Sequence, residues 1–80
     1  MRMWEGFHHD RKVPVIVRVE YDEETGEYIV EVIRGYDTKE ITFEPKHEPK
    51  EGLMHISDVE RAVKIANKII KDLKSEARKK

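Results

Sequence analysis

The chain has 80 residues, of which 41% are charged and 38% hydrophobic, and its formal net charge is −1. It contains no cysteine, which excludes a disulfide framework and a thiolate zinc site. A chain of this length forms one domain, residues 1–80, with a modest core and little room for a deep catalytic cleft.

Two further exclusions follow from the order of the residues. The apolar runs are too short to span a membrane, and the N-terminus lacks the apolar region of a signal peptide, so we expect a cytoplasmic or a recombinant protein. Glutamine is absent and Asn67 is the single asparagine, while lysine and glutamate dominate. This bias is typical of thermostable proteins, and we expect a high melting temperature.

Residues 1–12 form an N-terminal arm outside the regular pattern that follows. The arm contains Met3, Trp4 and Phe7, and then the adjacent histidines His8 and His9. We expect it either to cover apolar surface of its own chain, as a flap or an added edge strand, or to meet a partner.

Residues 13–44 predict a three-stranded antiparallel meander. Valines alternate along "VPVIVRVEY" and "YIVEVI", and the acidic loop "DEETGE" between them contains Gly26, which supplies a positive φ. Pairing Asp22 with Glu27 sets Tyr21 opposite Tyr28 and continues through Val19–Val30, Val17–Val32, Arg18–Glu31 and Ile16–Ile33. The third strand, "EITFE", is predicted to place Ile41 opposite Val32 and Phe43 opposite Val30.

Residues 45–56 are a polar loop broken by Pro45 and Pro49, and residues 57–79 are predicted to form a helix. Ser57 followed by Glu60 has the spacing of a capping box, and Asp58 adds negative charge to the first turn. The predicted apolar stripe consists of Ile56, Val59, Val63, Ala66, Ile70, Leu73 and Ala77.

The fold class is therefore α+β, with a βββα order in which the long C-terminal helix packs on the valine face of the meander. Apolar side chains remain outside this arrangement. Ala62, Ile65 and Ile69 widen the apolar arc of the helix, and Ile16, Ile29 and Ile33 lie on the reverse face of the sheet. One of these surfaces needs a cover, either the arm or a partner.

The residues give little support for catalysis, a cofactor or a metal site. Adjacent histidines on an extended segment point to opposite sides, so His8 and His9 do not suit one ion, even with His47, Glu48 and His55 as remote ligands. Ser57 and Ser75 are the only serines, and the oxygen of Ser57 is expected to cap the helix. We therefore predict a non-enzymatic protein with neither cofactor nor metal.

The charge is unevenly distributed along the chain. Segment 58–80 has a net charge of +4, and segment 13–57 has a net charge of −6. Arg61, Lys64, Lys68 and Lys71 form a stripe on the helix face opposite the core. Such a stripe supports nucleic-acid binding as an alternative function.

Two segments, "VEYDEETGEYIVEV" and "AVKIANKIIKDLKSEARKK", resemble computationally designed α+β miniproteins, which favour Glu/Lys surfaces, Thr-Gly turns and capped helices. The resemblance covers residues 15–34 and 57–80 and implies a designed scaffold or binder. The segments "MRMWEGFHHDRK" and "PKHEPKEGLMH" depart from that style. Their irregularity is typical of a natural protein, such as one from a hyperthermophile or a virus, or of designed segments shaped around a target.

The sequence thus predicts a small, stable protein-binding domain that does not span a membrane. Aromatic anchors favour an interface on the arm, with a protein partner or a second copy. The predicted interface residues are Met3, Trp4, Phe7, His8 and His9 on the arm, and Ile16, Ile29 and Ile33 on the open face of the sheet.

Overall fold

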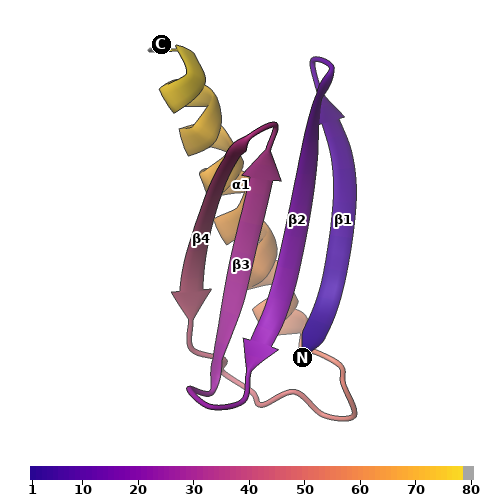
Figure 1. The fold of residues 1–80 in the computed structure, drawn as a ribbon. Coiled ribbons are helices and arrows are strands. Elements are labelled where there is room, and N and C mark those ends of the chain that lie inside the picture. The colour runs from indigo at the N-terminus through magenta and orange to yellow at the C-terminus, as the bar shows by residue number, and fades with distance from the viewer. Residues whose placement is uncertain (79–80) are drawn as a thin grey trace.

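The computed structural model describes residues 1–78 as four antiparallel strands followed by one helix (Figure 1). The sheet has the strand order β1-β2-β3-β4, so every strand pairs with its neighbours in the sequence. The elements are β1 (Arg2–Asp10), β2 (Val13–Asp22), β3 (Glu27–Arg34), β4 (Asp37–Phe43) and α1 (Ile56–Arg78). The α+β class is confirmed, and the sheet has four strands because the arm takes one of the two forms expected for it, an added edge strand, β1. Lys79, the last residue of the predicted helix, lies outside the described residues.

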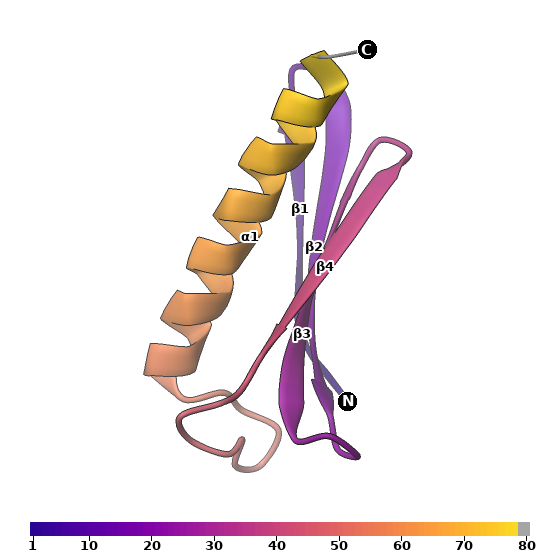
Figure 2. The ribbon, with the colours of Figure 1, turned by 90° about the vertical axis from the view of Figure 1, so that its left-hand side faces the viewer.

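Helix α1 lies on one face of the sheet, and no described element lies on the other face (Figure 2). Its packing is mainly against β3 and β4. A helix is about 10 Å across, and neighbouring strands are about 4.8 Å apart, so one helix cannot cover all four strands. The edge strand β1 is therefore covered only in part, and no described element covers the opposite face of the sheet.

The core lies between α1 and the sheet and contains the alternating side chains predicted for β2 and β3. Each of these strands contributes every second residue, because successive side chains point to opposite faces of a sheet. The buried apolar residues are Val15, Val17, Val19, Tyr28, Val30, Val32 and Phe43 from the sheet, and Ala62, Ala66, Ile69 and Leu73 from the helix.

The predicted hairpin between β2 and β3 is confirmed pair by pair, from Asp22–Glu27 to Ile16–Ile33. Gly26 has a φ of 74°, as the turn requires. The Asp22 side chain also accepts the backbone N–H of Glu24 at 2.9 Å and orders the acidic loop.

The predicted register of the next hairpin is wrong by two residues. In the structure Ile41 pairs with Val30 and Phe43 pairs with Tyr28. Gly35, with a φ of 61°, and Tyr36 form a two-residue turn that sets Arg34 opposite Asp37, whereas the predicted register requires a longer loop. A shift of two keeps every side chain on its own face, so the hydrophobic pattern does not distinguish the two registers.

The buried face of α1 also differs from the predicted stripe. Ala62 and Ile69, which the pattern placed at the margin, are fully buried, while Val63 is 42% exposed and Ile56 is 66% exposed. The apolar arc of this helix is wide, so packing decides which part of it faces the sheet. The guanidinium of Arg61 lies 4.9 Å from the centre of the Phe43 ring and contributes to this orientation at the β4 flank.

The predicted capping box is not formed, because α1 begins one residue earlier and His55 takes the capping position. The carbonyl of His55 accepts the backbone N–H of Val59 at 3.0 Å. The ring nitrogen Nδ1 of His55 accepts the backbone N–H of Ser57 at 3.2 Å and lies 2.8 Å from the Ser57 hydroxyl oxygen. An imidazole nitrogen thus fills the place predicted for the serine oxygen.

Candidate functional site

The pairing of β1 with β2 separates the side chains of the predicted arm interface. Trp4 lies opposite Val19 and His8 opposite Val15, on the helix side of the sheet. Phe7 lies opposite Ile16, on the open face. The five arm residues predicted for one interface are therefore divided between two surfaces, with His9 beside Phe7 on the open face.

Met3 and Trp4 belong to the edge of the core rather than to an exposed anchor. The ladder is irregular between Arg2 and Trp4, and both Met3 and Trp4 pack against the core cluster. The indole nitrogen Nε1 of Trp4 is hidden from solvent and has no hydrogen-bond partner among the described residues. These two half-buried side chains are therefore weaker candidates for a partner interface than the exposed Phe7.

The open face carries an apolar row that runs across three strands. Phe7 lies next to Ile16, and Ile16 lies next to Ile33. The Phe7 side chain is 68% exposed, and the two isoleucines are half-buried. Ile29 is on the same face but in a separate row, next to Thr42. The row of Phe7, Ile16 and Ile33 is referred to below as the open-face row.

A charged row runs beside the open-face row. Arg18 bonds through Nε to the Glu5 carboxylate at 2.6 Å, and its Nη1 lies 3.5 Å from the carboxylate of Glu31. The hydrogen bond to Glu5 outweighs desolvation and, with both carboxylates, raises the pKa of the Arg18 guanidinium. Acidic groups outnumber basic ones on this face, where the glutamates are Glu5, Glu20, Glu27, Glu31 and Glu40.

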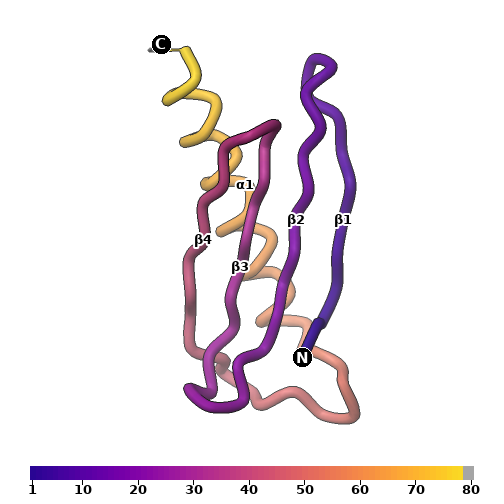
Figure 3. Tube along the Cα trace, viewed as in Figure 1, coloured from indigo at the N-terminus to yellow at the C-terminus, as the bar shows by residue number. Residues whose placement is uncertain are grey.

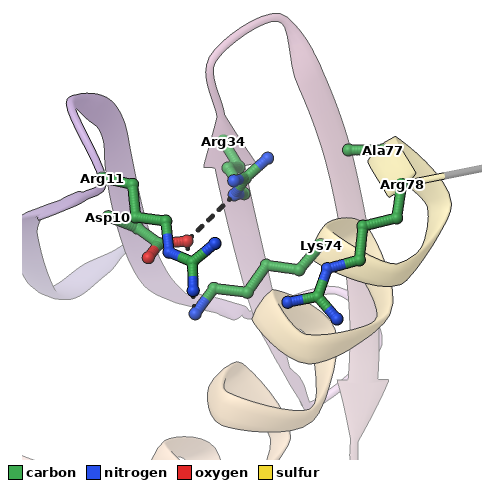
Figure 4. A pocket seen from close by; sticks show the side chains of 6 residues that line it. All are labelled: Asp10, Arg11, Arg34, Lys74, Ala77 and Arg78. Carbon is green, nitrogen blue, oxygen red and sulfur yellow. Dashed lines mark hydrogen bonds and ion pairs between the residues drawn. The ribbon is translucent and has the colours of Figure 1, made fainter. Parts of the chain in front are cut away.

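A second set of charged side chains, called the cationic cluster below, lies on the helix side of the sheet near the C-terminal end of α1 (Figure 4). It surrounds Asp10 and lines a cavity of about 190 Å³. The Asp10 carboxylate lies 3.2 Å from Lys74 Nζ and 3.3 Å from Arg34 Nε. Arg11 and Arg78 complete the lining, so four cations surround one carboxylate.

Sequence reasoning missed the cationic cluster because its members come from three separate parts of the chain. Asp10 and Arg11 are at the end of β1, Arg34 ends β3, and Lys74 is on α1. Figure 3 shows that the β1–β2 turn and the C-terminal end of the helix lie at the same end of the molecule. Only the strand pairing and the position of α1 bring these side chains together.

The charge of Asp10 is stabilised by this arrangement. Partial desolvation raises the pKa of the carboxyl group, but the hydrogen bonds and charges of Lys74 and Arg34 outweigh it, so the pKa lies below its usual 3.8. A carboxylate with a lowered folded-state pKa stabilises the fold above its unfolded-state pKa, and this contribution is lost as the pH falls through the folded-state pKa.

We therefore expect Asp10→Asn to remove part of the acid sensitivity of the fold. The free energy of unfolding of the wild type falls as the pH drops below about 4. The variant is less stable than the wild type at pH 7, and the difference narrows at lower pH. Urea unfolding measured across this range checks the expectation, and a stability difference that is independent of pH contradicts it.

The basic stripe predicted for nucleic acid is only partly available. Lys64, Lys68 and Lys71 are exposed on the outer face of α1. Arg61 donates a hydrogen bond to the Glu44 carbonyl at 3.1 Å and stacks on Phe43. Only three lysines of this stripe then remain free to contact a phosphate backbone, and the open face of the sheet, on the other side of the molecule, is acidic.

The histidines do not form a metal centre within residues 1–78, where no three His, Cys, Asp or Glu side chains are placed to share an ion. His47 and His55 instead stack, with ring centres 3.8 Å apart. The stack joins the loop to the start of α1.

Comparisons with known proteins identify no relative of this chain. No protein-family model, no curated protein and no solved structure matches the chain. Among the described residues, no helix is both long enough and apolar enough to cross a membrane.

Proposed function

We propose that this chain is a small, non-enzymatic protein-binding domain, and that a partner protein docks on the open face of its sheet. The observation that carries the proposal is the open-face row, in which the Phe7 side chain is 68% exposed beside two half-buried isoleucines. Aromatic residues, Phe included, are enriched in protein interfaces, and an exposed apolar patch often marks an interaction site.

The charges around the row define the chemistry of the partner. The glutamates of the open face flank the apolar row, and Arg18 is already paired with Glu5 and Glu31. A partner surface that presents lysine or arginine around one large apolar side chain complements both features. An acidic partner would be repelled, as would a nucleic-acid backbone.

Selection of peptides on the folded chain tests this proposal. We expect a displayed library of random linear peptides to yield sequences that contain basic residues and a large apolar anchor, with affinity that falls as salt is added. Phe7→Ser should weaken the affinity for the recovered peptides by about thirtyfold or more, because loss of a hot-spot side chain costs at least about 2 kcal/mol.

Leu53→Ser is the matched control, because Leu53 is 71% exposed in the loop at the opposite end of the sheet. It should leave the affinity within about twofold. Recovery of acidic peptides, or equal losses for both variants, would contradict the proposal. Sedimentation velocity at increasing concentration identifies the case in which the partner is a second copy of the chain.

A further inference from the structure

A trough follows the seam between β1 and α1 on the helix side of the sheet. Because α1 packs mainly on β3 and β4, the helix does not cover β1 fully, although Trp4 packs at the edge of the core there. The cavity at this seam has a volume of about 270 Å³. Its apolar walls are Trp4 from β1, Val17 from β2, and Val63, Ala66 and Ile70 from α1.

Gly6 widens this trough. It lies opposite Val17, between Trp4 and His8 on the same face of β1, and it has no side chain to fill the seam. A Cβ atom built there would lie 3.6 Å from His8 Nε2 and 3.9 Å from Trp4 Cζ3, both ordinary contact distances. The site could therefore hold a larger residue, and a glycine inside a strand often marks a close approach by another group.

The trough and the cationic cluster are neighbours along the same seam. His8 and Asp10 are successive residues on one face of β1, and Ile70 and Lys74 are one turn apart on α1. The seam is thus apolar beside Trp4 and strongly cationic beside Lys74. Figure 4 shows Arg11 and Arg78 extending toward Lys74 from opposite sides.

We propose that this seam binds a small amphiphile with one aliphatic chain and one anionic head group. The head group, a carboxylate or a phosphate ester, takes the charge-assisted hydrogen bonds of Arg11, Lys74 and Arg78. The chain lies over Gly6 between Trp4 and Val63. Only together do the two cavities reach the size of a small-molecule site, and they are too small for a helix or a folded partner.

The emission of Trp4, the only tryptophan, reports binding directly. We expect a saturable change on titration with decanoate or decyl phosphate below their micelle concentrations, and the two titrations distinguish the carboxylate from the phosphate head group. Inorganic phosphate and decyltrimethylammonium should bind at least about tenfold more weakly, because the first lacks the aliphatic chain and the second lacks the anionic head group.

Variants assign the two halves of the site. Gly6→Val should abolish the response by filling the trough, and Arg11→Gln with Arg78→Gln should weaken binding by about tenfold. The latter pair is exposed, so it tests the proposal even if Gly6→Val impairs folding. Lys68→Gln with Lys71→Gln removes the same charge from the outer helix face and should leave binding unchanged.

Several results would overturn the proposal. Equal binding of decanoate and decyltrimethylammonium would indicate nonspecific partition, and binding of inorganic phosphate as tight as that of decyl phosphate would remove the role of the chain. Unchanged binding by folded Gly6→Val, or an equal loss in the Lys68 and Lys71 control, would also contradict it. None of these results bears on the open face, which has its own test.

Discussion

Replacement of Ile69 by alanine is expected to destabilise the fold by about 2–5 kcal/mol, the usual range for removing a fully buried isoleucine side chain. Ile69 is completely buried at the centre of the helix face that contacts the sheet. The neighbouring core residues include Ala62 and Ala66, whose short side chains cannot reach into the resulting cavity. Urea unfolding followed by circular dichroism measures the loss.

Val63→Ala is the control for this experiment. Val63 belongs to the stripe that the sequence favoured, but it is 42% exposed at the trough. Its truncation should cost less than about 1 kcal/mol. If Val63→Ala is the more damaging change, α1 faces the sheet with the predicted stripe and the packing described above is wrong.

Asp58→Ala is expected to cost about 2–4 kcal/mol, because it leaves two backbone donors without an acceptor. The Asp58 carboxylate is fully buried and accepts the backbone N–H of Lys46 at 3.0 Å and that of His47 at 3.2 Å. It joins the loop after β4 to the first turn of α1, where the helix dipole also favours a negative charge.

Hydrogen exchange locates this effect. The amides of Lys46 and His47 should lose protection in Asp58→Ala before the strands do. Glu60→Ala removes the exposed residue that the sequence placed in a capping box, and it should change the free energy of unfolding by less than about 0.5 kcal/mol. Similar losses for the two variants would contradict the assignment of Asp58 as the residue that joins the loop to the helix.

The parts of the fold that were predictable are those set by local pattern. The alternation of valines and the loop between Asp22 and Glu27 determine the β2–β3 pairing residue by residue. The next hairpin was not determined in this way, because a shift of two residues preserves the alternation. Its register depends on the two-residue turn at Gly35 and Tyr36.

The helix was predictable in extent but not in orientation. Its apolar arc is broad, so periodicity alone does not identify Ile69 as its centre. The capping prediction failed for a different reason. Ser57 has the favoured chemistry for a cap, but the ring of His55 is held at the capping position by its stack on His47. Contacts of this kind form between residues that are not adjacent in the sequence and leave no recognisable motif.

The candidate surfaces lie mostly in the segments that depart from an idealised pattern. The arm becomes β1, and the alternation of β1 places Phe7 on the open face and Trp4 beside the core. The pattern of the arm left open whether it forms a flap or an edge strand. Without a strand register, the aromatic residues were grouped in one interface, and the cationic cluster around Asp10 went undetected.

The most direct test of the proposed function is amide chemical-shift mapping of the isotope-labelled chain with a basic peptide from the selection described above. The proposal predicts that the perturbed amides gather around Phe7, Ile16 and Ile33 on the open face. Perturbations confined to the outer face of α1, around Lys64, Lys68 and Lys71, with Phe7, Ile16 and Ile33 unchanged, would contradict it.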